Sequence, residues 1–478
     1  MDVHRNFIDG EWVGGSSARE NINPSDITDI VGLYTQGGKA DVEAAVAAAE
    51  RALPGWSGST PQLRFDVLDA VGSEILARKA ELGRLLAREE GKTLPEGVAE
   101  VTRAGYIFKY FAGEALRAAG EHIDSVRPGV TIDVLRKPLG VVGLITPWNF
   151  PIAIPAWKVA PALAFGNTVV LKPADLAPGC AWAIAEILSR TPLPRGAFNL
   201  VMGPGRVVGQ TMVAHPGIAG ISFTGSVETG RSIAVDCAKR MARVQLEMGG
   251  KNPLVVLDDA DLDVAVAAAL QGSFFATGQR CTASSRLIVT AGIHDRFVAA
   301  MTRRMEALKV DDALADGTEI GPVVDEAQLE KDLSYVEIGV AEGGALAAGG
   351  RRLRRPKNGF YFAPALITGT SGGMRINREE VFGPVASVIR VRDYDEALGA
   401  ANDTEFGLSA GICTTSLKYA SHFSRHAQAG MIMVNLPTAG VDYHVPFGGR
   451  KGSSYGTREQ GRYAIEFYTT VTTCYTQP

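Results

Sequence analysis

The chain lacks several features that mark common classes of protein. Only five of its 478 residues are cysteines, and they form no CxxC pair and no His/Cys spacing typical of metal ligands. We therefore expect neither a disulfide framework nor a metal site. No stretch approaches the roughly 20 uninterrupted apolar residues that a membrane-spanning helix needs. The opening MDVHRNFIDGEWVGG has no apolar run followed by a cleavage site, so we expect no signal peptide.

Positive charge is not in excess either. The chain has 48 Lys and Arg against 52 Asp and Glu, a net charge of −4 and a pI near 6.1. This balance argues against nucleic acid or an anionic membrane surface as a partner. Hydrophobic residues make up 46 % of the chain, which can therefore bury large cores, and its length suggests two or three domains. We expect a globular, cytoplasmic protein.

The N-terminal region is predicted to contain a hairpin and two helices. FIDGEWV at 7–13 is typical of a hairpin, because Asp9–Gly10 suits the positive φ angles of a tight turn. DVEAAVAAAERAL has apolar residues at helical spacing, with Asp41 placed to cap the helix. A longer helix is predicted over 62–90, ending at Gly91.

From residue 132 onward the pattern changes to strands alternating with helices. Short β-branched runs recur, each followed by a turn and a helical segment: VVGLITPWN, NTVVLKPA, AFNLVMG and GISFTGS. This repetition predicts a doubly wound parallel sheet, whose ligands bind at the carboxyl ends of the strands. A second α/β region is predicted from about 250 to 450, and the final EFYTTVTTCYT alternates like an edge strand. The strand ends marked in this way are Trp148–Asn149, Lys172–Asp175, Gly203–Gly205 and Thr224–Ser226.

Two of these turns suit a nucleotide, although each also has a plainer explanation. In FTGSVETG, Gly225 and Gly230 flank a helix start, where a pyrophosphate can approach the backbone. The spacing is not GxGxxG, and a tight connection explains these glycines equally well. In LKPAD, Lys172 and Asp175 could hold two ribose hydroxyls or belong to a solvated loop. The residues expected to continue the apolar face of the helix after FTGS are Ile233, Cys237 and Met241.

Two further residues have the chemistry of a catalytic pair. Glu247, in LEMGGKNP, lies between apolar residues and a Gly–Gly pair, where a carboxyl group tends to have a raised pKa and can act as a general base. Cys281, in GQRCTASS, has a polar, glycine-containing setting in which a thiolate can be stabilised and reached. Taken singly, a paired structural glutamate and a buried thiol remain the alternatives. We expect the other four cysteines to be small buried hydrophobes.

The order of the motifs separates these alternatives. TPWNFP, LKPA, FTGS, LEMGGKNP, GQRC and EEVFGPV occur in the order found in the aldehyde dehydrogenase superfamily, and the resemblance covers essentially the whole chain. It implies that Cys281 is the nucleophile that attacks the aldehyde carbon, and that Asn149 and the Cys281 N–H stabilise the oxyanion. Glu247 would activate the water that hydrolyses the thioester, and Lys158 and Glu459 match residues implicated in proton relay.

The resemblance also implies NAD as cofactor. Lys172 and Asp175 match the clamp on the adenosine ribose, the 225–230 turn matches the pyrophosphate site, and Glu380 and Phe382 match contacts to the nicotinamide ribose. Asp175 is shorter than the glutamate common in NAD-preferring members, so NADP is expected as a second cofactor. The full set of expected cofactor-binding residues is Ile145, Thr146, Pro147, Trp148, Lys172, Pro173, Asp175, Gly205, Gly209, Phe223, Thr224, Gly225, Ser226, Gly230, Met248, Glu380 and Phe382.

By the same resemblance the expected fold is α/β with three parts. They are a Rossmann-type cofactor domain (1–119 and 139–249), an α/β catalytic domain (250–455) and a small β oligomerisation element (120–138 and 456–478). Pairing of the terminal edge strand with another subunit implies a homodimer or homotetramer.

The loop GVDYHVPFGG and the tail SSYGTREQGRYAIEFYTTV resemble the subgroup that oxidises 2-oxoglutarate semialdehyde (2,5-dioxopentanoate). Such a substrate needs a cation and polar donors deep in the site, and Arg103 is the predicted anchor for its carboxylate, with a surface salt bridge as the alternative role. The residues expected to line the substrate pocket are Arg103, Phe150, Trp157, Arg280, Tyr443, His444 and Phe447.

Three other functions are weighed against this one. The enzyme could oxidise succinate or glutarate semialdehyde, or aliphatic aldehydes broadly. Relatives that transfer the thioester to CoA usually lack the glutamate found here at 247, so hydrolysis is favoured. A non-catalytic structural protein of the same fold is a remote alternative, because such proteins can lose the nucleophile or cofactor residues that this chain retains.

Overall fold

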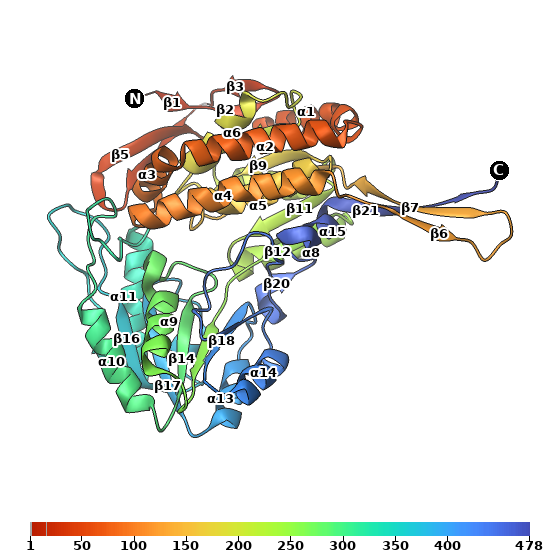
Figure 1. The fold of residues 1–478 in the computed structure, drawn as a ribbon. Coiled ribbons are helices and arrows are strands. Elements are labelled where there is room, and N and C mark those ends of the chain that lie inside the picture. Colours follow the sequence, from red (N-terminus) through yellow and green to blue (C-terminus); the bar gives the residue numbers. More distant parts are fainter. Residues whose placement is uncertain (1, 16) are drawn as a thin grey trace.

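An eight-stranded sheet forms the upper half of the molecule in Figure 1. The structure is a computed structural model and describes residues 2–15 and 17–478. The order is β20-β12-β11-β8-β9-β10-β2-β3, and β8 to β12 are parallel, as predicted for a doubly wound sheet. Its strands are β2 (Asn6–Ile8), β3 (Glu11–Val13), β8 (Val141–Ile145), β9 (Thr168–Lys172), β10 (Phe198–Leu200), β11 (Gly220–Thr224), β12 (Arg243–Glu247) and β20 (Ser454–Tyr455).

The strand order of this sheet reverses between β8 and β11. From β8 the chain proceeds outward through β9 and β10, then returns to add β11 and β12 on the other side. The crevice at such a reversal is where α/β sheets bind their ligands. Two hydrophobic cores cover the two faces. The helices on one face are α2 (Pro61–Ala77), α3 (Lys79–Glu90), α4 (Leu94–Ala115), α5 (Ala153–Ala164) and α6 (Gly179–Ser189), and those on the other are α1 (Lys39–Ser57), α7 (Gln210–Ala214) and α8 (Val227–Lys239).

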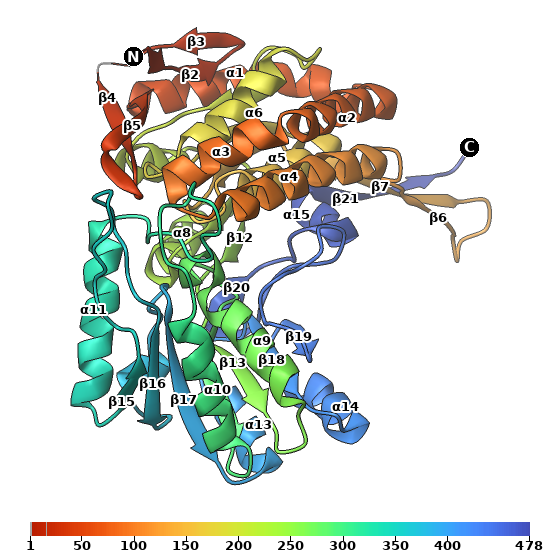
Figure 2. The same ribbon diagram turned by 60° about the vertical axis from the view of Figure 1, so that its left-hand side comes forward.

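A seven-stranded sheet forms the lower half, in the order β15-β16-β17-β14-β13-β18-β19 (Figure 2). Its strands are β13 (Asn252–Val256), β14 (Ser284–Thr290), β15 (Ala345–Ala348), β16 (Ala365–Thr370), β17 (Val385–Val391), β18 (Ser409–Cys413) and β19 (Met431–Val434). The helices of this half are α9 (Leu262–Phe274), α10 (His294–Glu306), α11 (Glu326–Ala341), α12 (Arg375–Arg378), α13 (Tyr394–Asn402) and α14 (Leu417–His426).

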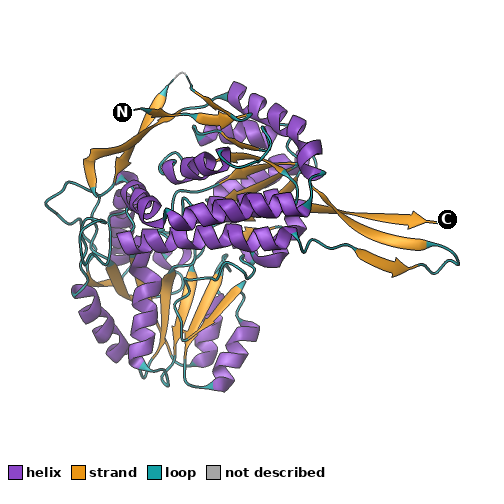
Figure 3. Ribbon diagram, turned by 45° about the horizontal axis from the view of Figure 1, so that its top comes forward, coloured by secondary structure: helices purple, strands orange, loops and turns teal. Residues whose placement is uncertain are grey.

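A three-stranded arm extends away from both halves (Figure 3). It consists of β6 (Glu121–Asp124), β7 (Thr131–Pro138) and β21 (Thr469–Thr476), which follows the short α15 (Ile465–Tyr468). The C-terminal β21 is an edge strand, as its alternation predicts. Cys474 on this strand is exposed, so the expectation that it is a buried thiol was wrong. A small sheet of β1 (Val3–His4), β5 (Asp26–Thr35) and β4 (Ala18–Asn23) covers another edge of the upper half.

The predicted hairpin is confirmed, with positive φ at Asp9 (51°) and Gly10 (77°). The single helix predicted over 62–90 was wrong, because two helices, α2 and α3, meet at Arg78. The Arg78 side chain binds carboxylates of both helices and of α6, a long-range contact that local periodicity cannot reveal. Gly91 does end α3, with φ at 97°.

The predicted capping role of Asp41 is confirmed: it lies at the third helical position of α1 and accepts a hydrogen bond from the Gly38 N–H at 2.8 Å. One smaller expectation needed correction. Met241 does not continue the apolar face of α8, because the helix ends at Lys239 and Met241 is 91 % exposed. Within 2–15 and 17–478, no helix is long and apolar enough to cross a membrane.

The packing of α3 on α4 generates a stability prediction. A Cβ added to Gly97 would lie 2.6 Å from the Gly83 carbonyl oxygen, and backbone cannot move aside as a flexible side chain can. Gly97→Ala is expected to lower stability by about 1–3 kcal/mol through overpacking. Gly399→Ala, in an open position of α13, is the matched control, expected to be neutral or to stabilise by about 0.4–1 kcal/mol. Thermal unfolding midpoints test both, and equal shifts would contradict this account of the interface.

Candidate active site

Cys281 lies between two cavities and lines both of them. One cavity, of about 300 Å³, is lined by residues of α4, α5 and the 439–447 loop. The other, of about 220 Å³, is lined by the carboxyl ends of β8, β11 and β12 and by α11. A thiol at this junction can contact a substrate in the first cavity and a cofactor in the second.

The backbone before Cys281 is strained in a way that fixes the thiol. Ala276, Thr277 and Gly278 are all left-handed, with φ of 48°, 54° and 64°, which is unfavourable for the two non-glycine residues. Neighbours hold this turn: Glu96 Oε1 accepts a hydrogen bond from the Ala276 N–H at 2.7 Å. After the turn, Asn252 Nδ2 donates to the Cys281 carbonyl at 2.8 Å.

Asn149, predicted as the oxyanion donor, lies next to the turn that carries Cys281. Its Nδ2 donates to the carbonyl of Gln279 at 2.9 Å, two residues from Cys281, and the side chain faces the second cavity. The loop that carries Asn149 is held by a buried ion pair that sequence reasoning missed. Lys92 Nζ binds the Asn149 carbonyl and Glu100 Oε2, the latter at 2.7 Å.

Glu247 ends β12 and is buried, and Ser454 Oγ donates to its Oε2 at 2.5 Å. Burial raises the pKa of the Glu247 carboxyl well above its usual value, and the nearby Glu459 raises it further. Burial likewise raises the pKa of the Cys281 thiol to about 12, with added effects of Glu380 and Glu247. At pH 7 the Cys281 thiol is therefore protonated in the resting site, and the Glu247 carboxyl is shifted toward its neutral form.

Lys158 and Glu459, predicted as a proton relay, form a buried ion pair. Lys158 Nζ donates to Ser222 Oγ at 2.7 Å, and Ser222 Oγ donates to Gln245 Oε1 at 2.9 Å. The ion pair therefore lies near the end of β12 that carries Glu247, and hydrogen bonds connect it to Ser222 and Gln245.

Eight of the 17 expected cofactor residues line the second cavity. Those that line it are Pro147, Trp148, Thr224, Gly225, Ser226, Met248, Glu380 and Phe382. Lys172 and Asp175 lie further along the sheet edge, 3.3 Å apart. The remaining ones do not line the cavity, although they lie at or next to the same strand ends and turns: Ile145, Thr146, Pro173, Gly205, Gly209, Phe223 and Gly230. Sequence reasoning missed Gln328 and Lys331, which α11 places in the cavity wall.

The donors and glycines of this region fit a dinucleotide. The Oγ1 atoms of Thr146 and Thr224 are buried without a hydrogen-bond partner among residues 2–15 and 17–478, which leaves them free for a ligand. Side chains close in around the glycines: a Cβ on Gly230 would lie 2.5 Å from Met248 Sδ. A dinucleotide can therefore reach the backbone of the 225–230 turn only because glycines occupy these positions.

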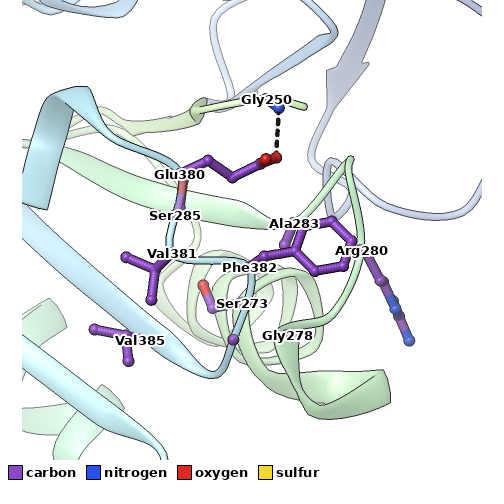
Figure 4. A pocket seen from close by; sticks show the side chains of 11 residues that line it. Gly250, Ser273, Gly278, Arg280, Ala283, Ser285, Glu380, Val381, Phe382 and Val385 are labelled. Atoms are coloured by element: carbon purple, nitrogen blue, oxygen red, sulfur yellow. Dashed lines mark hydrogen bonds between the residues drawn. The ribbon is translucent and has the colours of Figure 1, made fainter. Parts of the chain in front are cut away.

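A smaller cavity of about 20 Å³ lies behind the nucleophile loop (Figure 4). Glu380 is anchored in its wall by a hydrogen bond that its Oε1 accepts from the Gly250 N–H at 2.7 Å. The Glu380 carboxyl is buried, and this loss of solvent raises its pKa above the usual value. Phe382, two residues on, has a left-handed backbone with φ of 66°. The Glu380–Phe382 turn therefore touches both the nucleophile loop and the second cavity.

The first cavity contains five of the seven expected substrate residues. Those that line it are Arg103, Phe150, Trp157, Arg280 and Phe447. Tyr443 and His444 do not line it, contrary to expectation. Tyr443 stacks on Tyr106 at 5.7 Å between ring centroids and packs against the hydrophobic core, whereas His444 is exposed.

The three cations that line this cavity differ in their partners. Lys92 is paired with Glu100, and Arg280 lies 3.5 Å from Glu96. Arg103 forms no ion pair with any residue that the structure describes; its Nη2 donates to the neutral Gln460 at 3.1 Å. Arg103 is partly buried rather than on the open helix surface, and its guanidinium lies 5.5 Å from the Trp157 ring. The cavity therefore carries one uncompensated positive charge.

Comparison with known proteins identifies the fold and the reaction class. A sequence model of the aldehyde dehydrogenase family matches residues 12–474. This chain belongs to the aldehyde dehydrogenase family. The match confirms the family and the α/β fold predicted from the six motifs, and with them the prediction of an NAD(P)-dependent dehydrogenase.

Relatives of this aldehyde dehydrogenase are similar over nearly its whole length. The alpha-ketoglutaric semialdehyde dehydrogenase of Bacillus subtilis is 43 % identical and covers 100 % of this chain and 99 % of its own. The 2,5-dioxopentanoate dehydrogenase of Saccharolobus solfataricus is 41 % identical over 97 % of this chain and 98 % of its own. The crystal structure of betaine aldehyde dehydrogenase from Staphylococcus aureus in complex with NAD+ superimposes with a TM-score of 0.97, at 36 % identity, over 99 % of this chain and 95 % of that one.

The raised pKa of Cys281 predicts how the resting enzyme reacts with alkylating agents. Only the thiolate is alkylated, so with a pKa of about 12 the rate should rise about tenfold per pH unit from 7.5 to 9.5 without a plateau. The measurement is iodoacetamide modification in a Cys474→Ser background, because Cys474 is the exposed thiol, with Cys281→Ser added as the control. A plateau below pH 9 would show that the resting site stabilises the thiolate after all.

Proposed function

We propose that this enzyme oxidises 2-oxoglutarate semialdehyde to 2-oxoglutarate. The observation that carries the proposal is the uncompensated guanidinium of Arg103 in the cavity that leads to Cys281. A cation without a carboxylate partner suits a substrate that brings its own carboxylate. The names of the relatives from B. subtilis and S. solfataricus support the same substrate.

Betaine aldehyde, the substrate named for the S. aureus neighbour, carries a permanent positive charge. Arg103 would repel it, so we place it behind the oxo-acid aldehyde. Succinate and glutarate semialdehydes share the carboxylate and remain the alternative substrates. A broad aliphatic activity would leave the charge of Arg103 unused.

We infer the following roles for the catalytic residues. Cys281 gives its proton to water, and the resulting thiolate Sγ attacks the aldehyde carbon. Asn149 Nδ2 and the Cys281 N–H donate to the oxygen as it becomes an oxyanion. NAD held at the second cavity would supply the hydride acceptor for oxidation of the Cys281 adduct. The ionised form of Glu247 then takes a proton from the water that attacks the thioester, and the Glu459 carboxylate, paired with Lys158, accepts that proton in turn.

The residues that would hold the cofactor are those at the strand ends. Lys172 and Asp175 are placed for the adenosine ribose, and the 224–230 turn for the pyrophosphate. The Asp175 carboxylate repels a 2′-phosphate but, being shorter than glutamate, leaves room beside it. We therefore propose NAD as the main cofactor and NADP as a second.

We also propose that the arm joins subunits into a homodimer or homotetramer. It is the predicted oligomerisation element, and β21 has an unpaired edge. Apolar side chains on the arm are exposed, as expected for a surface that pairs with another copy: Ile123, Leu135, Val471 and Tyr475. The three-part domain division proposed from the sequence is consistent with this role.

Removal of the Arg103 charge should affect only carboxylated substrates. Arg103→Ala is expected to lower kcat/KM for 2-oxoglutarate and succinate semialdehydes by about 10–100-fold, the worth of a charge-assisted pair, and to change propanal turnover by less than about threefold. Steady-state rates with each aldehyde measure this, and Arg117→Ala, an exposed arginine just beyond α4, is the control. Equal losses on all substrates would contradict the anchor; equal use of propanal by the native enzyme would contradict the substrate.

Loss of the base should stop the reaction after oxidation. Glu247→Gln is expected to release about one equivalent of NADH per site and then slow by about 10²–10⁴-fold, because water is no longer activated. Rapid-mixing absorbance follows the burst, and mass spectrometry of the intact chain detects the acyl group on Cys281. Steady turnover without a burst would place the role of Glu247 before hydride transfer.

A further inference from the structure

Gln460 occupies a position that the chain holds at a conformational cost. Its φ is 58°, left-handed for a non-glycine residue, and Gly461 follows with φ of 53°. The backbone on either side is fixed: Glu459 and Phe447 exchange hydrogen bonds of 2.7 and 3.0 Å, and a Cβ on Gly461 would lie 2.7 Å from the His444 carbonyl. Such strain persists only where the surroundings over-determine it.

This conformation buries two adjacent side chains that serve different parts of the site. Glu459 contacts Lys158 beneath the sheet end, whereas Gln460 reaches Arg103 beside the aldehyde cavity. A guanidinium can only donate, so the acceptor in the contact at 3.1 Å must be the amide oxygen of Gln460. The contact therefore orients Arg103 without bringing a negative charge to it.

Two donors at this contact have no protein partner. Gln460 Nε2 and Arg103 Nε are both buried and unpaired among the residues that the structure describes. Lys92 and Arg280, the other cations of the cavity, have carboxylate partners. The partner of Arg103 is thus the neutral amide of Gln460, whereas the partners of Lys92 and Arg280 are carboxylates. The positive charge of Arg103 is therefore left unbalanced.

We propose that Gln460 is a positioning residue that sets the charge preference of the aldehyde cavity. It holds the Arg103 guanidinium toward the cavity and leaves its charge for the carboxylate of an ω-aldehyde acid. This inference rests on the proposed function, since it assumes that Arg103 receives the carboxylate. A carboxylate at 460 would pair with Arg103 and cancel the attraction, and an apolar side chain would leave the charge but lose its orientation.

The test compares Gln460→Glu and Gln460→Met with three aldehydes of different charge: 2-oxoglutarate semialdehyde, propanal and betaine aldehyde. For Gln460→Glu, KM for the oxo-acid aldehyde should rise about 10–100-fold, propanal should stay within about threefold, and kcat/KM for betaine aldehyde should increase. Gln460→Met should raise KM for the oxo-acid aldehyde by less than the acid does and should not improve betaine aldehyde. Gln62→Glu, the same charge change at an exposed position of α2, is the control for net charge.

The proposal would be overturned if Gln460→Glu and Gln460→Met changed kcat/KM for all three aldehydes by the same factor. It would also be overturned if KM for the oxo-acid aldehyde stayed within twofold of the native value in both variants. A fall in kcat with unchanged KM would also overturn the proposal, because it would show that Gln460 acts by positioning the adjacent Glu459 rather than Arg103. Arg103→Ala separates the two levels of inference. If that variant spares carboxylated aldehydes, the proposed function fails; if it affects them selectively while Gln460→Glu does not, only the role of Gln460 fails.

Discussion

The buried ion pair between Lys92 and Glu100 supports the whole active site. Lys92 Nζ contacts Glu100 and the Asn149 carbonyl and lies 3.5 Å from the centre of the Phe150 ring. Glu100 Oε1 accepts hydrogen bonds from the N–H groups of Ile152 and Ala153, each at 3.2 Å, where α5 begins. Removing one partner of such a pair leaves an unpaired buried charge, typically at a cost of about 3–5 kcal/mol. The pair thereby joins α4, which shapes the substrate cavity, to the loop and helix that carry Asn149, Trp157 and Lys158.

Loss of solvent shifts the protonation of the buried acidic groups in the active site. The pKa values of Cys281, Glu247 and Glu380 are all raised, first of all by burial, and Glu380 and Glu247 raise that of Cys281 further. Three groups that could carry negative charge are therefore held toward their neutral forms. Any positive charge brought into the second cavity favours their ionised forms, so a thiolate is easier to form when the site is filled than when it is empty. The resting Cys281 thiol is therefore expected to react slowly with alkylating agents.

The sequence predicts the location of residues that directly follow a strand. It does not predict contacts between residues that are far apart in the sequence. Asn149, Lys172, Thr224 and Glu247 could be placed together because the carboxyl ends of parallel strands share one edge, and β9, β8, β11 and β12 are neighbours in that order. Lys92, between α3 and α4, and Gln328 and Lys331, on α11, were missed because polar side chains of these types have no local signal of burial or of a ligand site. The break at Arg78 and the packing of Tyr443 on Tyr106 depend on partners more than a hundred residues away, which periodicity does not contain.

Catalysis and specificity are carried by different parts of the fold. The proposed catalytic groups come from strand ends and from a turn locked by three successive left-handed residues, so their positions tolerate little change. The substrate cavity is instead lined by α4, by α5 and by the 439–447 loop, whose exposed edge has few such constraints. Arg103 and Gln460 connect the two parts, since Gln460 is next to Glu459 in the chain yet contacts only the specificity side. On the proposed roles, a change of side chain on the cavity face of α4 would alter which aldehyde is accepted while Cys281, Glu247 and the Lys158–Glu459 pair stay in place. One fold can in this way serve relatives named for substrates as different as an oxo-acid aldehyde and betaine aldehyde.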